Sequence, residues 1–235
     1  MKTISEIYPN APLIKVVCEV QFNGNLEIEA KKYIFQQTIQ EQYTKLFVPK
    51  IEGMDQAVAL EPFSFENADR SSGILLSINK FAYFEREYTG HENFIKEFLR
   101  LFEILKKIVD IQKINRVGWR YINLIPFTRS NENIPIQDFL NVSVNIPKVN
   151  MDAINNFSVV LVSNAGSGQI TTKLEPVISN ERSEAILLDF DFAEIENINS
   201  ENIKDKIDRA HDYTRDLFES MITERYRQYL RGEEI

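Results

Sequence analysis

The sequence predicts an α+β protein whose sheet is largely antiparallel, and three observations support this prediction. Most of the expected strands follow one another closely enough to pair as hairpins. The expected helices fall singly between groups of strands, whereas a doubly wound parallel sheet needs a helix after nearly every strand. The chain also ends in a long expected helix with an apolar stripe.

The first half of the chain is expected to follow the order β-α-β-β-α-β, the split βαβ arrangement of ferredoxin-like folds. Alternating apolar residues predict a first strand over 13–22. Apolar residues at helical spacing predict helices over roughly 26–47 and 91–111. Two strands are expected between these helices, near 57–66 and 73–88, joined by a polar turn. The strand that holds the only tryptophan completes the order.

The second part is expected to be rich in strands and to close with a single long helix that begins near Ser200. A loop-rich section over roughly 128–156 includes one short expected strand, Phe139–Ile146. Three further strands are expected at Phe157–Val162, Gln169–Val177 and Glu184–Ile195. The Gly-Ser-Gly sequence at 166–168 lacks the Lys-Ser/Thr pair of a phosphate-binding loop and opens a strand, so it predicts a hairpin turn.

Length and composition bound the class of protein. The 235 residues are 43% hydrophobic and 26% charged, which is ordinary for a globular protein with a sizeable core. We interpret the chain as a single α+β unit over 1–235, with two halves, 1–127 and 128–235, as the alternative. The net charge of −8 disfavours general nucleic-acid binding, because neutralising phosphates needs a basic surface.

The cysteine content and the hydropathy indicate the cellular setting. The single cysteine, Cys18, cannot form an internal disulfide, and its apolar surroundings predict a buried hydrophobic residue. No run approaches the ~18 apolar residues of a membrane-spanning helix, and no leader-like segment opens the chain. The expected protein is therefore soluble and cytoplasmic.

The segment Lys113–Phe127 carries the most distinctive pattern in the chain. If it is a strand, alternation places Arg116, Gly118 and Arg120 on one face. The opposite, core-facing side then carries Val117, Trp119, Tyr121, Ile125 and Phe127. Two guanidinium groups on either side of a position without a side chain are suited to an anion or to a partner's carboxylate.

Two carboxylates share a face of a later expected strand. Asp189 and Asp191 alternate there with the apolar residues Ile186, Leu188, Phe190 and Phe192. The pair could share a Mg²⁺ ion, hold the arginines of the central segment, or form the solvated face of an amphipathic strand. If the Arg and Asp residues pair, they are structural; if a pocket separates them, they form a polar ligand site.

Histidine and nucleophilic residues offer little catalytic chemistry. His91 and His211 are the only histidines, too few for a His-rich zinc site. His211 lies beside the apolar stripe of the last expected helix, so it is expected at the boundary of the core. There it is a structural histidine, a general base or a ligand contact. No arrangement typical of nucleophilic catalysis is present.

Several stretches resemble a known family. Arg116-Val-Gly-Trp-Arg-Tyr-Ile-Asn123 resembles the central Arg-x-Gly-x-Arg-Tyr-Ile-Asn motif of a sporadically distributed prokaryotic family of about this length and of unknown function. Asn10–Phe22 is similar to that family's opening segment. The C-terminal pattern of the family is matched by Asp189, Asp191, His211 and Phe218.

The resemblance implies a genomic context more than a chemistry. The family's patchy distribution implies mobile genes, such as those for phage defence or toxin–antitoxin pairs. It implies no particular activity, cofactor or catalytic residue. Lys15 and Gln21 depart from the family pattern, which has Glu and Arg at these positions, so any pairing between those two residues is absent here.

The leading functional hypothesis is a non-enzymatic binding module that recognises a protein partner or a small anionic ligand and needs no cofactor. Its candidate binding residues are Arg116, Arg120, Asn123, His211, Asp189 and Asp191. The alternative is a metal-dependent phosphoesterase or nuclease in which Asp189 and Asp191 hold Mg²⁺. A third interpretation makes the last helix a homodimer contact through Tyr226, Tyr229 and Leu230.

Overall fold

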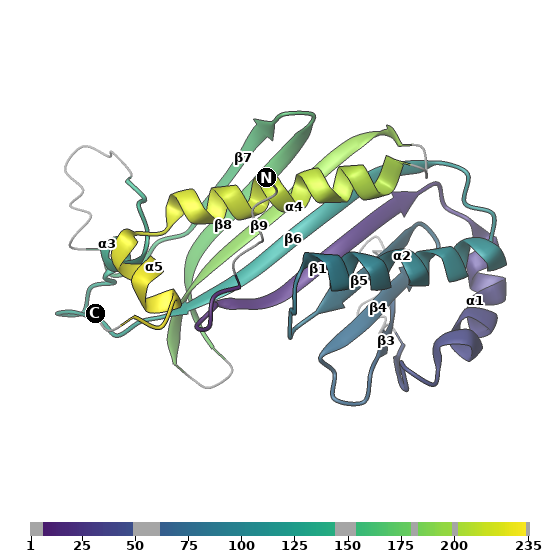
Figure 1. Ribbon diagram of the computed structural model, residues 1–235, viewed down its shortest axis with the longest axis horizontal. Coiled ribbons are helices and arrows are strands. Elements are labelled where there is room, and N and C mark those ends of the chain that lie inside the picture. Colours follow the sequence, from purple (N-terminus) through teal and green to yellow (C-terminus); the bar gives the residue numbers. More distant parts are fainter. Residues whose placement is uncertain (1–6, 49–61, 144–153, 180–182, 199–201, 234–235) are drawn as a thin grey trace, which may run out of the picture. The chain divides into compact units, whose positions relative to one another are not determined.

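The computed structural model describes residues 7–48, 62–143, 154–179, 183–198 and 202–233 (Figure 1). Over these residues the chain is a mixed α+β protein with a nine-stranded antiparallel sheet and five helices. The strands are β1 (Leu13–Phe22), β2 (Lys45–Phe47), β3 (Phe63–Glu66), β4 (Ser72–Ser77), β5 (Lys80–Glu85), β6 (Ile114–Pro126), β7 (Val159–Ala165), β8 (Gly168–Ile178) and β9 (Glu184–Ile198). The helices are α1 (Leu26–Ile39), α2 (His91–Ile108), α3 (Ile136–Phe139), α4 (Ile203–Met221) and α5 (Glu224–Leu230). The strands hydrogen bond in the order β2-β3-β4-β5-β1-β6-β9-β8-β7.

The chain forms two compact units, and each is assembled from separate stretches of sequence. The first unit contains residues 1–14, 120–192 and 210–235, and the second contains 15–119 and 193–209. Strands β1, β6 and β9 and helix α4 therefore contribute one part to each unit. Neither unit follows a division of the chain near residue 128.

The second unit is built around an aromatic core between strands β1 to β5 and helices α1 and α2. Strand β5 pairs antiparallel with both β1 and β4. Five phenylalanine rings pack between the strands and the helices, with neighbouring centroids 5.4–6.3 Å apart: Phe35, Phe65, Phe81, Phe98 and Phe102. Burying each such ring contributes about 1.5–3 kcal/mol, so this cluster is a major source of the unit's stability.

Among the residues described between α1 and α2 there are four strands, rather than the two expected. The expected helix over 26–47 ends at Ile39, and its last residues form β2 instead. The expected strand over 73–88 is a hairpin of β4 and β5 that turns at Ile78 and Asn79. One turn-forming residue between two apolar runs is a weak signal, which explains the error. The expected strand over 57–66 is described only from residue 62, and β3 lies within that part.

The first unit contains a β-hairpin that confirms the expected role of the Gly-Ser-Gly sequence. Strands β7 and β8 pair antiparallel from Val159 opposite Leu174 to Ala165 opposite Gly168. The turn between them consists of Gly166 and Ser167, and Gly166 has a φ of +59°. A positive φ is disfavoured for residues with a Cβ, so glycine suits this turn.

The prediction of a single C-terminal helix is wrong, because the helix is interrupted between α4 and α5. Ile222 bridges to Leu140, and the Thr223 N–H donates to the Phe139 carbonyl at 2.9 Å. The Thr223 hydroxyl then accepts a hydrogen bond from the Tyr226 N–H, which caps α5. The expected start near Ser200 lies outside the described residues.

The prediction of a strand over Phe139–Ile146 is also wrong for residues 139–143, the part of this segment that the structure describes. Phe139 ends the short helix α3, and only Leu140 makes an isolated bridge there. Residues 144–146 lie outside the described part of the chain. Among the described helices, none is both long and apolar enough to cross a membrane.

Candidate functional site

Strand β6 has the two-sided character that its sequence predicts. Val117, Trp119 and Tyr121 are buried, whereas Arg120 is exposed. In the second unit, the Trp119 ring packs edge-on against Phe94, with centroids 5.1 Å apart. The period-2 alternation of a half-buried strand therefore separates an apolar face from a charged one here.

Arg116 occupies the position that Gly118 leaves open. A Cβ built on Gly118 would lie 3.0 Å from the Arg116 Cζ, so the guanidinium group lies directly over this glycine. From there Arg116 Nη1 donates to the Glu19 carboxylate at 2.7 Å. The same carboxylate accepts a hydrogen bond from Gln21 at 2.7 Å and lies 3.5 Å from the Lys80 ammonium group. The space over Gly118, which was expected to be open to an anion, is thus filled by the side chain of Arg116.

Arg120 and Asp189 form a two-point ion pair within the first unit. Arg120 Nε donates to Asp189 Oδ1 at 2.8 Å, and Nη2 donates to Oδ2 at 2.5 Å. The Asp189 side chain is only 8% exposed, while that of Arg120 is 45% exposed. Of the two possibilities for these residues, pairing across the sheet is therefore the one observed, and a carboxylate held by both oxygens is a strong partner for arginine.

The geometry at Asp189 also bears on metal binding. Both oxygens of Asp189 accept hydrogen bonds from Arg120, so a divalent cation at this carboxylate would have to displace a guanidinium group. Asp191 is half-buried further along β9. Within the described ranges, no group of three or more His, Cys, Asp or Glu side chains converges as metal ligands would.

Asn123 and His211 are buried rather than exposed with Arg120. Asn123 Nδ2 donates to the Leu188 carbonyl at 3.1 Å, which links neighbouring strands. The His211 ring lies edge-on to Tyr121 with centroids 6.2 Å apart, and its Nδ1 is 3.2 Å from Asp212 Oδ1. The six predicted residues are therefore not gathered at one exposed site: Arg116 belongs to the second unit and the other five to the first.

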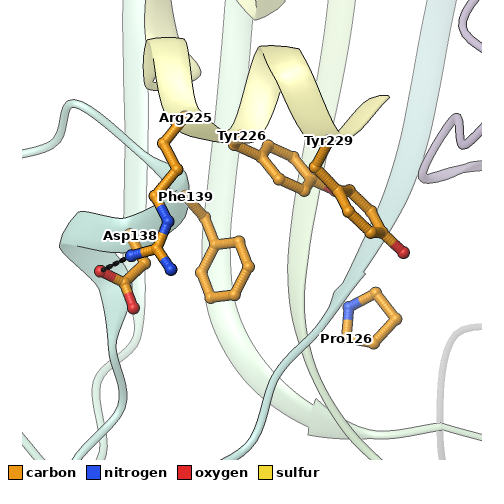
Figure 2. A pocket seen from close by; sticks show the side chains of 6 residues that line it. All are labelled: Pro126, Asp138, Phe139, Arg225, Tyr226 and Tyr229. Atoms are coloured by element: carbon orange, nitrogen blue, oxygen red, sulfur yellow. Dashed lines mark ion pairs between the residues drawn. The ribbon is translucent and has the colours of Figure 1, made fainter. Parts of the chain in front are cut away.

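A pocket of about 280 Å³ lies in the first unit, where α3, α5 and the end of β6 meet (Figure 2). Six residues line it: Pro126, Asp138, Phe139, Arg225, Tyr226 and Tyr229. The Phe139 ring packs edge-on against the Tyr226 ring, with centroids 5.3 Å apart. The Tyr226 and Tyr229 rings are stacked, with centroids 5.9 Å apart. Its lining combines aromatic rings with a few polar groups, a composition shared with small-molecule sites.

One charged pair lies beside these rings. Arg225 Nη1 is 3.5 Å from Asp138 Oδ1, the contact drawn as a dashed line in Figure 2. Both side chains are more than half exposed. This distance exceeds that of a strong charge-assisted hydrogen bond, so the pair is weak. Arg225 therefore keeps most of its hydrogen-bonding capacity for another group.

The local sequence explains why the pocket forms. Tyr226 and Tyr229 are three residues apart in α5, which places both rings on one side of the helix. The Thr223 hydroxyl, which caps α5, also donates to the Asp138 carbonyl at 2.8 Å. Asn141 Nδ2 donates to the Ile222 carbonyl at 2.9 Å, which holds the end of α3 against the start of α5.

Burial decides the roles of the aromatic residues. Tyr226 is buried, and this burial raises the pKa of its phenol well above the ordinary value, with a further contribution from Tyr229. Tyr226 thus stays neutral and serves as a wall of the pocket. Leu230 is fully buried, so of the three residues expected to form a dimer surface only Tyr229 is well exposed.

The sequence pattern did not predict this pocket. Tyr226 and Tyr229 were expected as part of a dimer contact, and Asp138 and Phe139 lie in a segment expected to be loop and strand. The signal that could have indicated the pocket is an arginine and two tyrosines within one helical turn at the end of a stripe.

Comparison with known proteins adds no assignment. The chain matches no protein-family model, and no curated protein sequence matches it significantly. The family resemblance carried by Arg116–Asn123 stays a prediction. At the two departures from that family's pattern, Gln21 donates to Glu19, and the Lys15 ammonium group lies 4.3 Å from the centroid of the Phe84 ring.

Proposed function

We propose that this protein is a non-enzymatic binding module that recognises a segment of a partner protein through the pocket between α3 and α5. The observation that supports the proposal is the combination of two stacked tyrosine rings, of which Tyr229 is exposed, with a weakly paired arginine. Aromatic residues and arginine are the residue types most enriched where interfaces gain most of their binding energy.

The chemistry of the lining favours binding over catalysis. The described lining residues are three aromatic side chains, one proline and one Arg–Asp pair. This set offers apolar surface and one cation, but no nucleophile held beside a base. It suits a ligand that buries an apolar group and presents a carboxylate to Arg225.

Binding of a partner protein at this pocket is favoured over binding of a small anion at Arg116 and Arg120 of β6. Arg116 is held by Glu19, and Arg120 is held by Asp189. An anion at either guanidinium would compete with a carboxylate already in place, at a cost of about 1.5–3 kcal/mol for each hydrogen bond to a charged group. Arg225 has no comparable competitor, since Asp138 is 3.5 Å away and exposed.

The partner segment is an extended peptide with a bulky apolar or proline side chain followed by an acidic residue. Extended and proline-rich peptides bind to grooves lined by aromatic rings, because the peptide is already ordered and the rings provide flat apolar surface. The acidic residue would pair with Arg225 at the rim of the pocket.

The test is selection of peptides from a random library on the purified full-length protein, followed by fluorescence polarisation of the enriched peptides. Enriched peptides should carry the apolar–acidic pattern. Tyr229→Ala should weaken their binding about tenfold or more, equivalent to about 1.4 kcal/mol, and Arg225→Glu should weaken it further.

The matched control is Tyr33→Ala, which removes an exposed tyrosine from α1. This variant should bind the peptides as tightly as the wild type. The proposal fails if the library yields no enriched peptide, or if the enriched peptides bind Tyr229→Ala and Arg225→Glu as tightly as they bind the wild type.

A further inference from the structure

Strand β7 is an apolar strand at the end of the hydrogen-bonding order. One edge of β7 pairs with β8, and no strand follows β7 on its other side among the described residues. Val160, Leu161 and Val162 are 57%, 61% and 57% exposed, although they are consecutive branched aliphatic residues. A strand edge of this kind offers unpaired backbone N–H and C=O groups together with apolar side chains.

This edge lacks the usual protection against strand pairing. Sheet edges are normally blocked by charged side chains, proline or a bulge. The β7 sequence Val-Val-Leu-Val-Ser-Asn-Ala contains no charge and no proline, in a chain that is 26% charged. Its consecutive apolar residues point alternately to the two faces of the sheet, so apolar side chains flank the open edge on both faces.

We infer that β7 pairs antiparallel with β7 of a second copy of this chain. Self-complementarity favours this occupant: a two-fold axis at Leu161 places Leu161 opposite its copy and Val160 opposite Val162. Every central cross-strand pair is then apolar. Such pairs contribute roughly 0.2–1 kcal/mol each, in addition to the backbone hydrogen bonds that the edge gains.

The β7 edge itself presents no charge that would repel its copy. The net charge of −8 on each chain opposes association of two copies on average, so contact is least opposed at an uncharged surface such as this one. The neighbouring strand β8 preserves that neutrality. Lys173, which lies opposite Val160, pairs with Glu175 at 2.6 Å. The other β8 residues opposite the apolar run are Thr171 and Thr172.

The inference goes beyond the proposed peptide site, and the two are tested independently. Sedimentation velocity of the full-length chain over roughly 1–100 µM, the range in which weak dimers with μM affinities form, should show a dimer. Leu161→Lys should yield a monomer, because it places two ammonium groups opposite each other at the axis. The matched control Leu26→Lys changes a leucine that is 75% exposed at the start of α1, and it should remain dimeric.

A cross-linking experiment tests the register directly. Opposite residues in an antiparallel pair have Cα atoms about 4.5–5.5 Å apart, within the range that a disulfide spans. Leu161→Cys should therefore form a disulfide-linked dimer on mild oxidation, whereas Leu26→Cys should not. The native Cys18 is buried and does not interfere.

The outcomes separate the possibilities. A wild-type monomer throughout the concentration range overturns the inference, whether or not β7 pairs with a strand of another protein. A dimer that persists in Leu161→Lys, or equal cross-linking of Leu161→Cys and Leu26→Cys, also overturns it, because the copies then meet elsewhere.

Discussion

Arg120 donates two hydrogen bonds to Asp189, with Nε at 2.8 Å from Oδ1 and Nη2 at 2.5 Å from Oδ2. The arginine lies in β6 and the aspartate in β9, which are neighbours in the sheet although the two residues are 69 positions apart. Because Asp189 is nearly buried, the pair is structural: the guanidinium compensates a carboxylate that water reaches poorly.

Removing the Arg120 side chain alone should therefore lower the free energy of unfolding more than removing the Arg120 and Asp189 side chains together. Arg120→Ala leaves the Asp189 carboxylate without its partner and should lower the free energy of unfolding by about 1–3 kcal/mol. The double variant Arg120→Ala/Asp189→Ala should recover part of that loss. Urea unfolding followed by circular dichroism measures these two variants and the single variant Asp189→Ala. If the losses of the two single variants add up to the loss of the double variant, the pair does not stabilise the fold.

Substitution of two glycines by alanine should lower the stability of the fold by different amounts. A Cβ on Gly73 would lie 2.7 Å from the Phe65 carbonyl oxygen and 2.6 Å from the buried Phe84 ring, neither of which can move easily. Gly73→Ala should cost about 2–3 kcal/mol, as overpacking does in a tight core. The three atoms nearest to a Cβ on Gly118 all belong to the flexible end of Arg116, so Gly118→Ala should lower the free energy of unfolding by about 1 kcal/mol or less.

Thermal unfolding of the two alanine variants tests this order. Gly24→Ala is the control, because its added Cβ would meet no atom closer than 4.0 Å. If Gly118→Ala proves the more damaging change, the position of Arg116 over Gly118 is far more rigid than a side-chain end should be.

Asp208 should make the free energy of unfolding depend on pH in the acidic range. Burial opposes ionisation of Asp208, but hydrogen bonds from Lys204 and His91 outweigh it, so the pKa of Asp208 is lowered in the folded protein. A lowered folded-state pKa stabilises the protein above the unfolded-state pKa of about 3.9. That contribution is lost as the pH falls through the folded-state pKa.

The measurement compares the free energy of unfolding of the wild type and Asp208→Asn between about pH 2.5 and pH 6, a window that spans the unfolded-state pKa of aspartate. The wild type should be more stable by a constant amount in the upper part of this window, and the difference should shrink below about pH 4. Asp216→Asn, at an exposed position on the same helix, should show no such convergence. A difference independent of pH would mean that Asp208 does not gain its partners on folding.

Local pattern was sufficient to predict the two faces of β6 and the β7–β8 hairpin. Side-chain alternation in a strand has a period of two residues, so the buried position of Trp119 and the exposed position of Arg120 follow from the sequence once the strand is recognised. The turn at Gly166 and Ser167 likewise depends on a conformation that neighbouring residues determine. These features are local, and the sequence alone was enough for them.

Tertiary structure decided which charged groups meet and where the pocket forms. The sequence left open whether Arg120 and Asp189 pair or line a cleft, because only the adjacency of β6 and β9 brings them together. The break before α5 depends on bridges from Leu140 and Phe139 to Ile222 and Thr223. No periodicity within a helix encodes such contacts, since they join residues about 80 positions apart, and the pocket exists only because these contacts hold α3 against α5.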